Sequence, residues 1–599
     1  MGKPGLILGK SWPEYIGVRC FIFFMRYLPG LCLLYFFVVF ALGGVRAIAH
    51  PVSLVVEVYG AIELCFYLCF FLPYKHFLQT YKPYKPPPLS RSQRAALLYR
   101  SLDLVSDPAS FLRKWMNNAP WEDIRVQNFK DWLLWALFEM DSSSPDFSLA
   151  PDINSEVEQY VEEVENKVGL KLPHGRGAAE PIRLSFDPVI VQHRALLMYL
   201  MIGLLDYATS TYLLLAGFRF YRPARSSFFS IFPLRPIHLL PFPPSAAPTM
   251  SYWCRPHKSA TQRPIVFLHG LGAGLPPYMF WFATLPKDVG VLAVEFLPLS
   301  ARITTALPST SELSDMIAAC IEQQRALNPS PAPGQPGAWD DFVLIGNSYG
   351  TLVMPSLLRR RDVADRVAAS VLIDPVSLLL HLPDVAYNFT RRPPRPAVRG
   401  RPGHANEWEL AWASATDPGT AHALARRFCW RESLMWREML TPSVRLAERG
   451  LAVPAAGKNH GLMRSTVILS GEDCVTCPKE VASLVFAGHT RWTPADVEEW
   501  EKYKWTGLQE LELVYLPDRD HGQGIMVFSP EPCILPVIED YCRRDDGFRV
   551  GGGEPVREPR VRPRSSHYPD EDEATGIELG KIGSTESALH PVEAYTRQL

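Results

Sequence analysis

The stretch around Ser348 constrains the fold of this chain most strongly, because it predicts a strand, a tight turn and a helix in immediate succession. Residues 342–345 are apolar and predict a buried strand. The turn follows in a Gly-x-Ser-x-Gly pattern with Gly346 and Gly350, and residues 351–353 begin a helix. This context is typical of a nucleophile elbow, where a serine hydroxyl projects from a strained turn. The two glycines let the strand and the helix pass close to that turn.

Other predicted strands also end next to histidine or carboxylate residues, which can act in acid–base catalysis. They are 263–268, which ends at His269 and Gly270; 371–373, which ends at Asp374; 465–470, which precedes Glu472 and Asp473; and 511–516, which precedes His521. Parallel sheets place their active sites at the carboxyl ends of strands. Serine, then acid, then histidine is the chain order expected of a sheet that carries its nucleophile on an elbow.

On these motifs, residues 250–548 resemble the α/β-hydrolase superfamily, in its serine-nucleophile branch of esterase- and lipase-like enzymes. The resemblance implies an α/β fold, with a mostly parallel central sheet flanked by helices and a helical cap. It also implies that Ser348 is the nucleophile, His521 the base and Asp473 the acid that orients the histidine. Resemblance to a superfamily does not identify the substrate.

The chemistry of acyl transfer requires these residue types. A serine hydroxyl becomes a good nucleophile only when a base takes its proton. An imidazole accepts and returns a proton near neutral pH, and a buried carboxylate holds it in the right tautomer. Backbone N–H groups must bind the oxyanion, and we expect those of Tyr349 and Leu271 to do so, with Gly272 as a second choice for the latter.

Several alternatives remain open at this stage. Asp374 follows a strand and is the main alternative for the acid, and Glu472 competes with its neighbour Asp473. His269 and Gly270 are expected to have a structural role in the oxyanion loop, which His269 supports through hydrogen bonds. His269 is not expected to act as a second base. Cys474 and Cys477 form a lone C-x-x-C pair, whereas a zinc site needs a second ligand pair. We therefore predict neither a metal nor a cofactor.

The N-terminal region predicts a membrane hairpin. Residues 27–45 are an uncharged run of 19 residues, long enough to span a bilayer. Residues 52–73 form a second apolar run, which carries Glu57 and Glu63. Because carboxylates are costly in lipid, we expect both to face a partner helix or to lie near an interface. A buried core helix is the alternative for the second run.

A third apolar stretch, 195–218, contains only Asp206 as a charge. It can span the membrane, lie in its interface or cover the sheet. Basic residues at both ends of the hairpin favour a cytoplasmic location for both ends. They are Lys3, Lys10, Arg19, Arg26, Lys75, Lys82, Lys85, Arg91 and Arg94. A third span would therefore place the catalytic domain in a lumen, where the sequon at Asn388 would become usable.

These observations divide the chain into segments. They are a membrane region at 1–85, a helical region at 86–248 with a membrane-associated helix at 195–218, a hydrolase core at 249–376 and 456–548, a helical cap at 377–455 and a disordered tail at 549–599. The layout resembles that of membrane-associated hydrolases of fungi. We expect an integral, multi-pass protein of an intracellular membrane such as the endoplasmic reticulum or a lipid-associated membrane.

The cap contains Trp408, Trp412, Trp430 and Trp436, which line a pocket for an apolar acyl chain or pack the cap on the core. The predicted function is a serine hydrolase that cleaves an apolar, lipid-like carboxylic ester. The alternatives are an acyltransferase with the same triad and a catalytically silent membrane scaffold. With a net charge of −1, nothing in the sequence indicates a nucleic-acid partner. The expected partners are the membrane and a small apolar ester or lipid.

Overall fold

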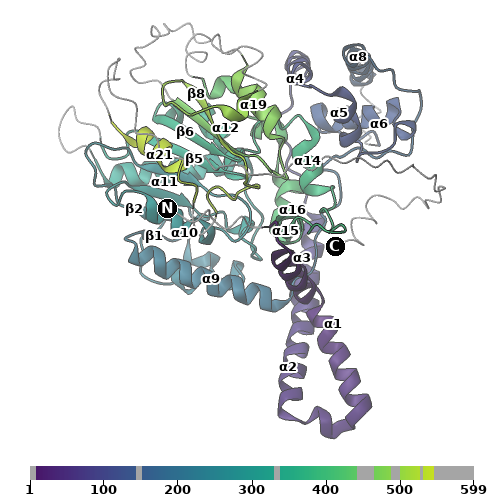
Figure 1. Cartoon of the computed structure of the whole chain (residues 1–599), viewed down its shortest axis with the longest axis vertical. Coiled ribbons are helices and arrows are strands. Elements are labelled where there is room, and N and C mark those ends of the chain that lie inside the picture. The colour runs from purple at the N-terminus through teal and green to yellow at the C-terminus, as the bar shows by residue number, and fades with distance from the viewer. Residues whose placement is uncertain are drawn as a thin grey trace, which may run out of the picture.

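The computed structural model describes residues 9–143, 151–329, 337–441, 464–487, 499–526 and 530–544. Within this part of the chain a sheet has the strand order β1-β2-β4-β3-β5-β6-β7-β8. Figure 1 labels β1, β2, β5, β6 and β8 of this sheet. The strands are β1 Arg219–Tyr221, β2 Tyr252–Arg255, β3 Ile265–Leu268, β4 Val291–Val294, β5 Phe342–Asn347, β6 Val367–Ile373, β7 Arg464–Ser470 and β8 Leu511–Leu516. Strands β3 to β8 are parallel to one another, and β1 and β2 are antiparallel additions. The predicted mostly parallel sheet is confirmed.

The strands are buried on both faces, which explains their continuous apolar sequences. In β3 the side chains alternate between two cores. Val266 and Leu268 pack with α11 Thr310–Leu327, α12 Gly350–Arg359 and α19 Pro478–Phe486. Ile265 and Phe267 pack with α10 Met279–Thr284 and α21 Ile534–Cys542 on the other face. The result is a three-layer α/β arrangement.

Two sets of helices surround this sheet. The first set precedes the sheet and packs on the core that contains Val266; its members are α4 Arg91–Asp103, α5 Pro108–Trp115, α6 Val126–Leu133 and α8 Pro151–Val168. The second set follows β6; its members are α14 Pro383–Thr390, α15 Ala405–Glu409, α16 Pro418–His422 and α17 Trp430–Ser433, whereas the short helix α13 Arg361–Ala364 connects α12 to β6. Helices α14 to α17 lie between β6 and β7 in the chain, where the cap was expected.

In the described part of the chain, three helices are long and apolar enough to cross a membrane. They are α1 Trp12–Ile48; the run Pro51–Thr80, which contains α2 Pro51–Phe66, the π-helix η1 Tyr67–Phe71 and α3 Leu72–Thr80; and α9 Leu196–Leu215. Helices α1 and α2 form a hairpin that projects from the rest of the molecule, and α9 lies along the domain that contains the sheet, at the hairpin base (Figure 1).

The observed sheet extends further toward the N-terminus than the sequence predicts. The sheet begins before residue 249, because β1 at Arg219–Tyr221 pairs with β2. A three-residue strand carries too little periodicity to be recognised in sequence, so the predicted core boundary is too late. The predicted tail at 549–599 and part of the predicted cap, 442–455, lie outside the described residues.

Candidate active site

The elbow places Ser348 between the end of β5 and the start of α12. Ser348 has a φ of 48°, a left-handed conformation that side chains other than glycine rarely adopt. The backbone is crowded on both sides of it. A Cβ atom on Gly350 would lie 2.1 Å from the carbonyl oxygen of Leu268, and one on Gly346 would lie 2.6 Å from the sulfur of Met354. The glycine pattern is therefore required by the close approach of β3 and α12 to β5.

Three side chains from three strand ends form a connected chain of hydrogen bonds. The Oγ of Ser348 lies 2.8 Å from Nε2 of His521. Nδ1 of the same imidazole lies 2.9 Å from Oδ2 of Asp473. All three residues are buried or nearly so. The structure thus brings together the serine, histidine and aspartate that the sequence singled out, in the spacing of an activated nucleophile.

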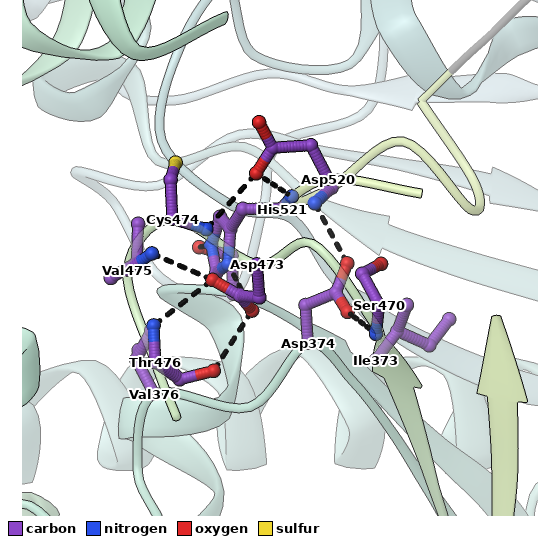
Figure 2. Close-up of polar contacts among 12 residues, drawn as sticks. Ile373, Asp374, Val376, Ser470, Asp473, Cys474, Val475, Thr476, Asp520 and His521 are labelled. Carbon is purple, nitrogen blue, oxygen red and sulfur yellow. Dashed lines mark hydrogen bonds and ion pairs between the residues drawn. The ribbon is translucent and has the colours of Figure 1, made fainter. Parts of the chain in front are cut away.

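The loop after β7 fixes the Asp473 carboxylate (Figure 2). Oδ1 accepts hydrogen bonds from the N–H groups of Val475 at 2.7 Å and Thr476 at 2.9 Å, and Oδ2 accepts one from the Thr476 hydroxyl. Burial acts to raise the pKa of Asp473, but His521 and these donors outweigh it and lower the pKa. The carboxylate therefore stays ionised against the imidazole.

The two alternative acids occupy other positions. Asp374 accepts hydrogen bonds from the N–H groups of Ser470 at 2.9 Å and Gly522 at 2.7 Å (Figure 2). It ties the end of β7 to the loop that carries His521, and its carboxylate has no hydrogen bond to the imidazole in the described structure. Glu472 is exposed and pairs with Lys10 at 3.0 Å.

Asp520 is a supporting residue that the sequence reasoning missed. Its Oδ1 accepts hydrogen bonds from the N–H groups of Cys474 at 3.0 Å and His521 at 2.7 Å (Figure 2). It therefore joins the loop of Asp473 to the loop of His521. The only signal was its place directly before the histidine, because its partner is a backbone group 46 residues away.

Leu271 and Tyr349 line the cavity that contains Ser348. Among the described residues, neither N–H has a hydrogen-bond acceptor. The N–H of Gly272, the second choice, donates to the carbonyl oxygen of Leu299 at 3.2 Å. The N–H groups of Leu271 and Tyr349 therefore remain the candidate oxyanion donors.

His269 and Gly270 hold this loop in place. Nε2 of His269 accepts a hydrogen bond from the N–H of Phe296 at 2.9 Å, so Nδ1 donates to the carbonyl oxygen of Gly270 at 2.7 Å. The N–H of Gly270 donates to the hydroxyl of Tyr278, which donates to Asn347 next to the serine. Burial lowers the pKa of His269 to about 4, so the ring is neutral in this role.

A cavity of about 670 Å³ opens at Ser348 and His521. Its lining is mostly apolar and comes from distant parts of the chain; it includes Val18, Phe21 and Ile22 of α1, Met198 of α9, Leu352 of α12, Val385 and Phe389 of α14, and Leu410, Trp412 and Leu424 of the cap. Of the four cap tryptophans, Trp412 lines this cavity. Trp408 packs under Arg19 of α1 and Trp436 under Arg100, so these two join the cap to other parts of the molecule.

The charge state of His521 predicts a pH dependence. Burial acts to lower its pKa, but the Asp473 carboxylate outweighs burial and holds the pKa above the ordinary value of about 6.5. A base must be unprotonated to act, so kcat/KM is expected to fall as the pH decreases through a value above 6.5. In Asp473→Asn this limb should move to lower pH. A pH series on both proteins measures the shift, and an unmoved limb would assign it to another group.

The match to a family profile agrees with the fold. Residues 265–535 match the sequence profile of the Alpha/beta hydrolase family. No curated protein sequence matches this chain. Similar solved structures include a 2-hydroxy-6-oxo-6-phenylhexa-2,4-dienoate hydrolase of a Rhodococcus species, at 14% identity over 49% of this chain and 95% of that chain with a TM-score of 0.28.

Two others are an esterase of Pyrococcus furiosus, at 13% identity over 46% of this chain and 79% of that chain with a TM-score of 0.26, and a membrane phospholipase A described as a bacterial virulence factor. The latter is 12% identical over 57% of this chain and 88% of its own, with a TM-score of 0.28. The sheet order, the elbow at Ser348 and the family profile together identify residues 265–535 as an α/β-hydrolase domain.

Proposed function

We propose that this protein is a membrane-associated serine hydrolase that cleaves an apolar carboxylic ester through an acyl-enzyme. The observation that carries the proposal is the connected arrangement of Ser348, His521 and Asp473 at 2.8 and 2.9 Å. A left-handed backbone conformation is strained, and surface serines rarely adopt it. Its combination with a buried imidazole that a buried carboxylate holds is typical of a catalytic serine.

In this mechanism the Oγ of Ser348 attacks the ester carbonyl carbon while Nε2 of His521 takes its proton. The carbonyl π electrons move to oxygen, and the N–H groups of Leu271 and Tyr349 bind the oxyanion. Each such donor contributes about 10²–10³ in rate. The tetrahedral intermediate expels the alcohol, which receives the proton from Nε2, and the acyl group stays on the serine. A water molecule, deprotonated by Nε2 of His521, then attacks the acyl carbon; the bond from that carbon to Oγ of Ser348 breaks, His521 returns the proton to Oγ, and the carboxylic acid leaves.

The cavity supports an apolar acyl group. At about 670 Å³ it is within the range of small-molecule sites, roughly 300–1,000 Å³, and hydrocarbon side chains dominate its lining. Part of its wall belongs to α1, one of the helices apolar enough to cross a membrane. An ester whose chain enters beside α1 can pass from lipid to Ser348 along apolar surface. This arrangement favours a lipid-like ester over a polar one.

The test is labelling of the detergent-solubilised protein with a fluorophosphonate probe. The parent protein should be labelled and Ser348→Ala should not. The matched control is Ser311→Ala, which removes an exposed serine in the first turn of α11 and should leave labelling unchanged. Labelling of Ser348→Ala would show that another serine reacts, and absence of labelling in the parent would overturn the proposed enzyme.

The substrate class is tested separately with a series of carboxylic esters of increasing acyl chain length. We expect kcat/KM to rise from acetyl to medium and long acyl groups, because each added methylene group gains apolar contact in the cavity. If the protein is labelled but prefers acetyl esters, the proposed serine hydrolase activity would still hold, and the proposal of a lipid-like substrate would be wrong.

A further inference from the structure

Helix α9 is long enough to cross a membrane but is fixed to the hydrolase domain along its length. Its 20 residues extend about 30 Å, which matches the hydrocarbon thickness of a bilayer. Its inward side packs into the protein, where Leu213 belongs to the core under the sheet. Near the other end, Met198 and Ile202 join the cluster between α1 and the cap.

Asp206, the only charged residue of α9, lies at the middle of this inward side. Its carboxylate binds Arg235 through two contacts, to Nε at 2.9 Å and to Nη2 at 3.0 Å, and Arg302 at 3.2 Å. Arg235 also pairs with Glu295, which directly follows β4. The two arginine side chains are 1% and 2% exposed. The midpoint of α9 is thus joined through buried ion pairs to the carboxyl end of β4.

The start of α9 is joined to both helices of the hairpin. The N–H of Ala195 donates to the carbonyl oxygen of Met25 in α1 at 3.0 Å. The N–H of Leu196 donates to both carboxylate oxygens of Glu63 in α2, at 3.0 and 2.8 Å. Glu63 is fully buried there and also accepts a hydrogen bond from Tyr59. A carboxylate that would be costly in lipid therefore caps the N-terminus of α9.

The outward side of α9 is apolar and uncovered. Successive helical residues are about 100° apart, which places Leu197, Leu204 and Leu215 opposite Asp206. Leu204 is 72% exposed and Leu215 is 84% exposed. Other exposed apolar residues on this side are Leu200, Met201 and Leu205. A stripe of this length, on a helix whose opposite side binds Arg235 and Arg302, marks a contact surface.

We propose that α9 lies flat in the interface of the membrane that receives the hairpin, with this leucine stripe in the lipid, and that it does not cross. The position of the hairpin indicates that the surface in contact with the leucine stripe is the membrane. Helix α9 begins at the level where α1 and α2 leave the domain, and it extends sideways from that base while the hairpin projects away (Figure 1). When the hairpin is in the membrane, the leucine stripe faces the same membrane. This is the arrangement of an interfacial helix, whose apolar side enters the lipid by about 5–10 Å.

This proposal does not depend on the proposed enzyme, and it decides where the hydrolase domain lies. Without a third crossing, the domain stays on the side that holds both ends of the hairpin. The sequon at Asn388 agrees with this placement. Its side-chain amide is partly buried and donates to the carbonyl oxygen of Val475, beside Asp473, at 3.1 Å. A glycan on that nitrogen would disturb the loop that holds the carboxylate.

The test measures the depth of single probes in proteoliposomes. The full chain carries alanine at its exposed cysteines, Cys20, Cys65, Cys69 and Cys533, and one new cysteine at position 204 or 215 labelled with an environment-sensitive fluorophore. The matched control is Leu327→Cys, an exposed leucine at the end of α11. Each protein is reconstituted with lipids that carry a quencher either near the glycerol or near the end of the acyl chain.

The expected result is that the probes at Leu204→Cys and Leu215→Cys are quenched more strongly by the glycerol-proximal lipid, to similar extents, and that the Leu327→Cys probe is not quenched. A crossing helix would give a different result, since position 204 would lie near the bilayer centre and respond most to the chain-end quencher, while position 215 would not. That result, or an absence of quenching at both positions, would overturn the proposal. Fluorophosphonate labelling of the same samples reports the enzyme separately.

Discussion

Asp473→Asn is expected to lower kcat/KM by about 10⁴-fold, because an amide in place of the carboxylate no longer holds the required tautomer of His521. The variant should fold, since the amide keeps the shape of the side chain and its oxygen can still accept from Val475 or Thr476. Steady-state hydrolysis of the best ester found for the parent measures the effect, with thermal unfolding as the check on folding.

Asp374→Asn and Glu472→Gln are the comparison variants. Asp374 binds the backbone of Ser470 and Gly522, so its variant should lose mainly stability, by about 1.5–3 kcal/mol for one charge-assisted hydrogen bond. Glu472 pairs with Lys10 at the surface, and its variant should behave like the parent. If Asp374→Asn abolished turnover in a folded protein while Asp473→Asn kept it, the acid would be Asp374.

Gly350→Ala is expected to prevent correct folding of the elbow. The added Cβ would lie 2.1 Å from the oxygen and 2.7 Å from the carbon of the Leu268 carbonyl. Both atoms belong to the backbone of β3 in the middle of the sheet, so β3 and α12 would have to separate. Overpacking costs about 1–3 kcal/mol where side chains can adjust, and a backbone clash costs more, against a total stability of about 5–15 kcal/mol.

The measurements for this prediction are the yield of monodisperse protein in detergent, the midpoint of thermal unfolding, and fluorophosphonate labelling. Gly346→Ala should be milder, because its nearest contact is the flexible thioether of Met354 at 2.6 Å. Gly30→Ala is the neutral control, since nothing lies within 4 Å of the added atom. A Gly350→Ala protein with the unfolding midpoint of the parent would show that β3 and α12 can separate at little cost.

Much of the hydrolase domain could be predicted because its signals are local. The central strands are short apolar runs, and a run that is buried on both faces keeps its composition whatever surrounds it. Each strand end is marked by the residue that follows it, as with Ser348 after β5 and His521 after β8. Since parallel strands end at one edge, the position of these residues along the chain predicted that they would meet.

The partners of single polar residues could not be predicted in this way. In the sequence, Asp374, Glu472 and Asp473 are all carboxylates near strand ends, and Asp520 directly precedes the histidine. Only the folded loops distinguish the one that contacts the imidazole from those that contact backbone groups or Lys10. Hydrogen bonds between residues about 50 to 150 positions apart leave no periodic trace in a sequence.

The sequence by itself determined the class of the fold, the elbow and the apolar character of the hairpin, because strand burial, turn geometry and lipid solubility depend on neighbouring residues. The tertiary structure decided that α1 forms part of the cavity wall and that the two sides of α9 have different surroundings. An apolar helix of 20 residues has the same composition in a core, in an interface or across a bilayer. The ion pairs of Asp206 distinguish these three locations. They form only when the chain folds and brings Arg235 and Arg302 against the helix.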